Sequence, residues 1–244
     1  MPLKEVAQVL GMSESGAHKR LLRLGIRPKP SQKPGYLNRN LRVRIPRSHS
    51  EDLAEFIGIM LGDGHLSPSQ VTVTLGTKEV GYAEHVVRLM KRLFVVQPKR
   101  CTISGGYTTV YLGSTRIVRW LQRMGLASNK VKAQVNIPLW CRSRPPFMRG
   151  VLRGLIDTDG SVYRLRRSTQ MSFCNRSKPL LRSARLLLIS LDFTPSRISG
   201  NKVYLTRAVD LVKYSKEVGF HNPKHKTRFR QFAGGSDSGN SIAL

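Results

Sequence analysis

Apolar and polar residues along this 244-residue chain follow two periods that alternate at regular places. Apolar residues three and four apart, the spacing of one helix face, run through residues 51–62, 79–94, 115–124, 145–158, 180–191 and 208–218. Period-two alternation, typical of strands, occupies 71–77, 161–165 and 170–174, and hairpins are predicted at 100–112 and around 199–201. Each half therefore predicts an αββαββα unit, and the fold class is α+β.

A short pattern occurs twice and marks the same place in both halves. Residues 56–64 read FIGIMLGDG and residues 152–160 read LRGLIDTDG. The offset between halves is 159 − 63 = 96 at the last acidic residue of the pattern, and 219 − 125 = 94 at the glycine after each half's last helix. Landmarks that keep their spacing this well indicate an internal duplication. We therefore expect two pseudo-symmetric repeats.

Small residues four apart form one ridge of the helix in each copy. They are Ala54, Gly58 and Gly62 in the first copy and Gly150, Gly154 and Thr158 in the second. Such a ridge lets another backbone approach closely. Two helices packed ridge to ridge would bring Asp63 and Asp159 side by side.

The repeats occupy 48–143 and 144–232, and the segments outside them differ in composition. Residues 1–27 predict a small helix-turn-helix-like segment, with Gly11 at the turn and Ser13 as the N-cap of the second helix. This segment is either DNA-binding or an ordinary helical hairpin. Residues 28–47 form a basic linker in which prolines prevent helix formation, and Ser48 with Glu51 forms a capping box for the next helix. Residues 233–244 predict a flexible tail.

Charge narrows the function more than any other bulk property. The chain has 42 Lys and Arg against 14 Asp and Glu, a net charge of +28 and a pI near 11.2. This excess indicates a nucleic-acid partner, and a membrane is disfavoured because no apolar run could span a bilayer. The three cysteines and six histidines form no zinc pattern. We expect an intracellular protein, in the cytoplasm and nucleoid or in an organelle matrix.

The outward faces of the predicted sheets are the candidate DNA-binding surface. Two twisted sheets related by a pseudo-two-fold axis would make a long, basic, concave saddle, and strands fit the major groove, where Arg and Lys can read guanine. The alternative for these arginines is a solvated charged face. The residues predicted to contact double-stranded DNA are Arg100, Thr72, Thr74, Arg164, Arg166, Arg197, Lys202 and Arg207.

Asp63 and Asp159 are the candidate catalytic carboxylates. Two close carboxylates repel each other unless a cation neutralises them. Magnesium suits carboxylates and phosphate oxygens, and such ions assist phosphodiester hydrolysis. One carboxylate per repeat would provide one cut per DNA strand. A basic residue after each repeat's last helix could stabilise charge on the phosphorane, and the candidates are Lys130 or Lys132 in the first repeat and Lys226 or Lys224 in the second.

FIGIMLGDG and LRGLIDTDG resemble the two motifs of the LAGLIDADG homing endonuclease family in its single-chain, two-motif form. The resemblance covers about residues 48–232, and the first copy departs from it at Leu61, where the family name has aspartate. It implies a saddle of two αββαββα units and a site-specific, metal-dependent cut through both strands of a long, pseudo-palindromic DNA target. The metal would be Mg²⁺ or Mn²⁺, the cut would leave short 3′ overhangs, and the biological role would be intron homing.

The same resemblance implies roles for particular residues. The backbone carbonyls of Gly62 and Thr158 would bind metal beside the two aspartates. Residues 222–226, which read NPKHK, resemble the family's typical ending and favour Lys226, with Lys130 as its partner, as the basic pair. Thr77 and Asn175 correspond weakly to a polar residue that contacts the metal and its water.

Two other functions suit the same basic saddle. One is a transcription regulator of this fold that has lost catalysis; loss of the acidic residues would favour it, and both Asp63 and Asp159 are present. The other is a maturase that binds its host intron RNA. Because both motifs lie in one chain, we expect a monomer.

Overall fold

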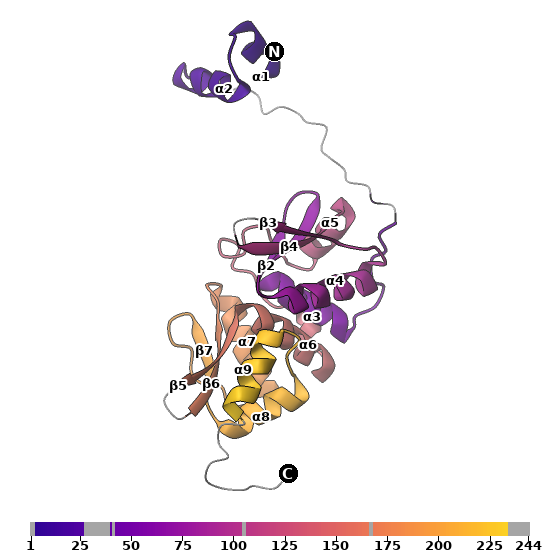
Figure 1. The fold of residues 1–244 in the computed structure, drawn as a ribbon, viewed down its shortest axis with the longest axis vertical. Coiled ribbons are helices and arrows are strands. Elements are labelled where there is room, and N and C mark those ends of the chain that lie inside the picture. Colours follow the sequence, from indigo (N-terminus) through magenta and orange to yellow (C-terminus); the bar gives the residue numbers. More distant parts are fainter. Residues whose placement is uncertain (1–2, 27–39, 41, 104–105, 166–167, 234–244) are drawn as a thin grey trace. The chain divides into compact units, whose positions relative to one another are not determined.

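The structure is a computed structural model that describes residues 3–26, 40, 42–103, 106–165 and 168–233 (Figure 1). The chain divides into two compact units, Met1–Leu37 and Asn38–Leu244. Most of the predicted linker, Arg166, and the predicted tail from residue 234 onward lie outside the described residues. No helix in the described ranges combines the length and the apolar character that a bilayer crossing requires.

The first unit contains two short helices, α1 (Leu3–Val9) and α2 (Glu14–Arg23). Gly11 between them has a φ of 59°, which glycine adopts without the steric cost of a Cβ. Ser13 caps α2, because its hydroxyl accepts a hydrogen bond from the amide of Gly16 at 3.2 Å. The buried residues here are Ala7 and Ala17, so the two helices meet through small side chains.

The first repeat has the predicted order of elements. Its helix α3 begins after Ser50, whose hydroxyl accepts from the amide of Leu53 at 3.1 Å. The predicted cap at Ser48 was two residues too early, because Ser50 is the extended residue directly before the helix. The four strands form an antiparallel sheet in the order β1-β2-β4-β3. The elements are α3 (Glu51–Leu61), β1 (Gly64–Leu66), β2 (Gln70–Gly76), α4 (Val80–Phe94), β3 (Lys99–Ile103), β4 (Tyr107–Gly113) and α5 (Thr115–Arg123).

The second repeat follows the same order with three paired strands, in the order β5-β6-β7. Residues 193–198, all of them described, form no strand, so the predicted hairpin around 199–201 has one β arm and a single bridge from Ser199 to Lys202. Pro195 explains the difference, because it has no amide to donate to a ladder. A short 3₁₀ helix (Leu139–Arg142) precedes the elements α6 (Pro145–Asp159), β5 (Gly160–Leu165), β6 (Ser168–Cys174), α7 (Lys178–Ser190), β7 (Lys202–Leu205), α8 (Ala208–Glu217) and α9 (Pro223–Ala233).

Helices α3 and α6 pack against each other, and their ridges of small residues meet. A Cβ added at Gly58 would overlap the carbonyl oxygen of Val151, and one added at Gly154 would lie 2.7 Å from the amide nitrogen of Ile59. The two backbones therefore touch directly, which side chains larger than hydrogen would prevent. One apolar core runs from this helix pair to the inward faces of both sheets.

Gly58→Ala should destabilise the protein by about 2–3 kcal/mol, because the added methyl group must push α6 away from α3. Gly154→Ala should act in the same way from the partner helix. Urea unfolding followed by circular dichroism measures both effects.

Gly81→Ala is the matched control for this pair. Gly81 is exposed in α4, where an added Cβ would meet only the Cγ of Pro223, at 3.1 Å. Alanine also has the higher helix propensity, so the control should stay within about 1 kcal/mol of wild type. Wild-type stability of Gly58→Ala would show that the two helix backbones do not touch.

Candidate active site

The ends of α3 and α6 bring one carboxylate from each repeat to the interface between the repeats. Asp63 comes directly after Gly62, the C-cap of α3, and Asp159 is the last residue of α6. A Cβ added at Gly62 would overlap the side chain of Thr158 and lie 3.5 Å from the Cγ of Asp159. The close approach of the two ridges thus continues to the helix ends, and it places the carboxyl group of Asp159 beside the backbone that carries Asp63.

Both carboxyl groups resist ionisation. Burial, together with the negative charges of Asp159 and Glu79, raises the pKa of Asp63 to about 6. Burial also raises the pKa of Asp159, against the opposing effects of a hydrogen bond from Asn175 and the charge of Lys130. A cation between the two carboxylates would relieve this cost.

Lys130 brings one positive charge to the pair. Its ammonium group donates to the carbonyl oxygen of Gly62, and to that of Met60 at 3.4 Å. Burial lowers the pKa of Lys130, and the attraction of Asp159 and Asp63 opposes this effect. The structure thus places Lys130, rather than the exposed Lys132, at the site.

Asn175 and Glu79 flank the two carboxylates. The amide Nδ2 of Asn175 donates to Oδ2 of Asp159 at 2.7 Å. Thr77, the counterpart expected in the first repeat, is exposed, and the residue whose charge reaches Asp63 is Glu79. The repeat offset could have identified it, because 175 − 79 = 96 is also the offset between the two aspartates.

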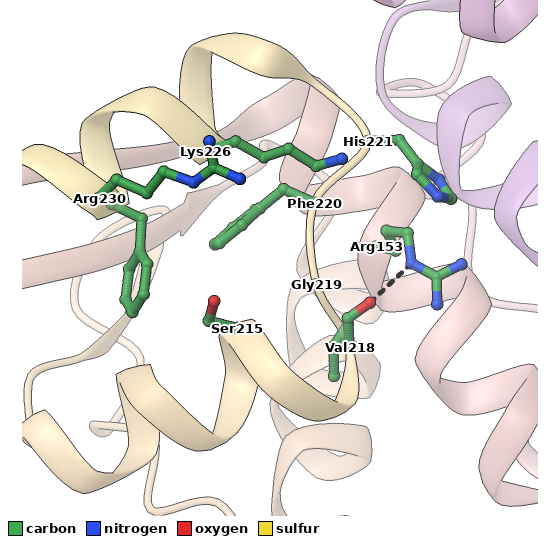
Figure 2. A pocket seen from close by; sticks show the side chains of 9 residues that line it. Arg153, Ser215, Val218, Gly219, Phe220, His221, Lys226 and Arg230 are labelled. Atoms are coloured by element: carbon green, nitrogen blue, oxygen red, sulfur yellow. Dashed lines mark hydrogen bonds between the residues drawn. The ribbon is translucent and has the colours of Figure 1, made fainter. Parts of the chain in front are cut away.

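The basic residue of the second repeat at this site is Lys224, not the predicted Lys226. Its Nζ donates to Oε1 of Glu79 at 2.9 Å, and its charge lowers the pKa of Asp63. Lys226 instead lines a separate pocket (Figure 2). Residues two apart in a helix point to opposite sides, so only one lysine of the pair can face the site. The offset near the end of the repeats, which is 94 residues between Gly125 and Gly219, identifies Lys224 as the counterpart of Lys130, because 224 − 130 = 94.

Glu79 holds Lys224 in place as an ionised partner. Burial alone would raise the pKa of Glu79, but hydrogen bonds from Asn222 and Lys224 outweigh that effect and leave the pKa below its usual value. The Nδ2 of Asn222 is 2.8 Å from Oε1 of Glu79 and 3.0 Å from the carbonyl oxygen of Asp157. The loop before α9 is therefore tied to both repeats.

The donor set fits a divalent cation. Asp63 and Asp159 offer the carboxylate oxygens that magnesium prefers. Burial is the largest cause of their raised pKa values, and a bound cation would offset that cost of ionisation. The carbonyl of Gly62 already accepts a cationic partner, the Lys130 ammonium group. Thr158 lies in the last turn of α6, where backbone carbonyls have no partner within the helix.

Strand register decides which predicted DNA-contacting residues of the first repeat face away from the helices. Thr72 and Thr74 lie on the outer face of β2, opposite its buried valines. Arg100 pairs with buried Val110 and so lies on the helix side, where its guanidinium group is 4.0 Å from Glu84 of α4. Lys99, one residue earlier, is on the outer face. The prediction of Arg100 was wrong by one residue, because a shift of one reverses the side of a strand.

The second repeat shows the same parity effect. Lys202 pairs with Cys174 on the outer face, in agreement with the prediction. Arg164 has the parity of buried Val162 and so lies on the helix-side face, at the exposed end of β5. Arg197 is exposed among residues 193–198, and Arg207 directly precedes α8 and donates to Oγ1 of Thr194 at 2.7 Å. Neither arginine lies in a strand.

The sequence is similar to a known family and to a known protein. A family model described as a LAGLIDADG-like domain matches residues 146–219. The replication factor C small subunit of Methanocaldococcus jannaschii is 27% identical over 115 residues, which is 47% of this chain and 6% of that protein. The match therefore spans only a small part of the length of that protein.

Solved structures share the fold. I-DmoI in complex with DNA and calcium has a TM-score of 0.52 at 13% identity, covering 74% of this chain and 97% of the other. The N-terminal LAGLIDADG domain of DUF199/WhiA has a TM-score of 0.51 at 15% identity, covering 78% and 94%. Full-length DUF199/WhiA from Thermatoga maritima has a TM-score of 0.51 at 13% identity, covering 84% and 67%. Similarity at these identities shows a common fold.

Asp63→Asn should stabilise the metal-free protein at about pH 7.5, by roughly 2 kcal/mol. The pKa of Asp63 is about 6 in the folded state against an ordinary value of 3.8. Its ionisation therefore costs folding free energy, and this cost appears as the pH rises through that range. The gain should shrink towards zero near pH 4, where the carboxyl group is protonated in the folded protein. Thermal unfolding at both pH values measures it, and an equal gain at both would exclude ionisation as the cause.

Proposed function

We propose that the chain, whose residues 146–219 match a LAGLIDADG-like domain, is a LAGLIDADG-family, metal-dependent endonuclease that cuts both strands of a long, pseudo-palindromic DNA target. One observation carries the proposal: Asp63 and Asp159, one from each repeat, meet at the α3–α6 interface with raised pKa values. A structural interface gains nothing from two repelling carboxylates, whereas a metal-assisted hydrolytic site needs them.

Asp63 and Asp159 would hold the cation, with the carbonyl groups of Gly62 and Thr158 as further ligands. Bound magnesium or manganese would supply Lewis acidity that activates water and stabilises the leaving oxygen. I-DmoI, a homing endonuclease of the same fold, has been crystallised with DNA and calcium, which supports a divalent ion here. Water attacks the phosphorus atom, the bond from phosphorus to the 3′ oxygen breaks, and that oxygen takes up a proton.

The lysines would act on the phosphate rather than on the cation. The ammonium groups of Lys130 and Lys224 approach the carboxylate pair from the two repeats. Positive groups in such a place stabilise the negative charge that builds up on the phosphorane oxygens. Glu79 orients Lys224, and Asn175 orients Asp159.

The DNA-binding surface would be the outer faces of the two sheets. Thr72, Thr74 and Lys99 lie on the outer face of the first repeat's sheet, and Lys202 lies on the outer face of the second repeat's sheet. The net charge of +28 favours binding of a polyanion. Because one chain supplies both carboxylates, we propose that the protein acts as a monomer. The two-helix unit at the start of the chain would add contacts to DNA or to the intron RNA.

Asp63→Asn and Asp159→Asn should each lower double-strand cleavage at least about a hundredfold while DNA affinity stays within a few fold, because asparagine cannot replace the charge that a cation requires. Cleavage selection from a randomised DNA library with magnesium supplies the substrate, and gel assays of cleavage and binding measure both properties. Asp52→Asn, the same change at an exposed residue of α3, is the control and should cleave normally. Wild-type cleavage by either site variant would exclude a shared catalytic site at these two aspartates. Absence of cleavage by the unaltered chain on DNA that it binds would instead favour a DNA-binding regulator of this fold.

Lys224→Met should reduce the cleavage rate about tenfold or more, since it removes a charge near the reacting phosphate. Lys226→Met removes the same charge from the same helix but from the side that lines the other pocket, so it should stay within about threefold of wild type. Single-turnover cleavage at saturating protein separates this effect from binding. The opposite ranking of the two variants would place Lys226 at the reacting phosphate.

A further inference from the structure

Three side chains of metal-ligating type meet in the second unit away from the carboxylate pair. They are Glu55 on α3, His85 on α4 and His221 between α8 and α9. The Nε2 atom of His85 is 2.6 Å from Oε1 of Glu55, and Nδ1 of His221 is 2.7 Å from the same oxygen. The three ligand atoms all lie within 4.8 Å of one another.

Both carboxylate oxygens of Glu55 have close hydrogen-bonding partners. Burial alone would raise the pKa of Glu55, but the hydrogen bonds and charges of His221 and His85 outweigh it and bring the pKa well below its usual value. The other oxygen, Oε2, accepts from Arg153 at 2.9 Å, and Arg153 also contacts Glu51 at 2.6 Å. Metal binding requires deprotonated histidines, and in that state two glutamates and one arginine give the cluster a net charge of −1.

Surrounding contacts hold the ligands in position, as they do in metal sites. The backbone amide of His221 donates to Oδ2 of Asp157 at 2.7 Å, and Nε of Arg153 donates to the carbonyl oxygen of Val218 at 2.7 Å (Figure 2). Glu55 is only 1% exposed, whereas the side chain of His221 is 36% exposed and lines the pocket in Figure 2. An ion can therefore reach the cluster from that pocket.

We propose that Glu55, His85 and His221 bind a divalent transition-metal ion of the zinc class and that this ion joins the two repeats. Two imidazoles and one carboxylate suit zinc, cobalt or nickel, whereas magnesium prefers oxygen ligands alone. Each histidine would bind through the nitrogen that now faces Oε1 of Glu55, and its proton would move to the other ring nitrogen. Water from the pocket would complete the coordination. The site is independent of the proposed cleavage chemistry.

The test is a calorimetric titration of the chelator-treated full chain with zinc chloride. The background is Asp63→Asn, Cys101→Ser, Cys174→Ser, which removes the two exposed thiols and one carboxylate of the candidate active site. We expect one zinc per chain, a raised melting temperature, and binding at least about tenfold weaker in His85→Gln and His221→Gln. His65→Gln changes an exposed histidine outside the cluster and should bind normally. Cobalt chloride should give visible absorption from a nitrogen- and oxygen-liganded ion, and magnesium chloride should not compete.

Absence of stoichiometric zinc binding would overturn the proposal. Equal zinc binding by wild type and His85→Gln would also overturn it. In both cases the three side chains would form only a hydrogen-bonded cluster. If His85→Gln does not fold, histidine ring resonances of the unaltered chain provide the second measurement. Zinc should shift the resonances of two of the six histidines, and a shift of any other pair, or of none, would also overturn the proposal.

Discussion

The direct contact between the backbones of α3 and α6 is the constraint on which the rest of this structure depends. Gly58 of α3 faces the backbone of α6, and Gly154 of α6 faces that of α3. Helices that touch at their backbones have little freedom to slide past each other. The register of this contact therefore fixes the position of the end of α3 relative to the end of α6. Asp63 and Asp159 meet for that reason. The sheets, whose inward faces share the core of the helix pair, are positioned by the same contact.

Close packing also concentrates charge between the repeats, and several ion pairs span that boundary. Lys224 of the second repeat pairs with Glu79 of the first, and Arg153 of the second pairs with Glu55 of the first. Removing one member of such a pair leaves an uncompensated charge in a partly dry site. The repeats are therefore coupled electrostatically as well as through apolar contacts, and Asp63 and Asp159 meet at the same boundary.

Periodicity and repeat spacing were enough to predict most elements of both repeats and the meeting of the two small-residue ridges. They failed where one residue decides the outcome. Arg100 and Arg164 were assigned to the outer sheet faces, but strand parity places them on the opposite side. Pro195 removed a strand that the duplication predicted. In each case the local sequence permits two local structures: either side of the strand for the arginines, and strand or loop for the segment around Pro195. Pairing with a distant segment selects one of them.

The sequence by itself determined the duplication, the glycine ridges, the acidic residue that ends each motif and the excess of positive charge, because these properties depend on spacing and composition within short segments. The tertiary structure decided that Lys224 rather than Lys226 approaches Asp63 and that Glu79 acts on Asp63 as Asn175 acts on Asp159, in agreement with the repeat offsets. Only the tertiary structure showed that Glu55 gathers two histidines. Those residues lie far apart in sequence, and their side chains come together only after helix rotation and loop path are set by packing. Folding therefore converts a periodic pattern into a specific set of neighbours.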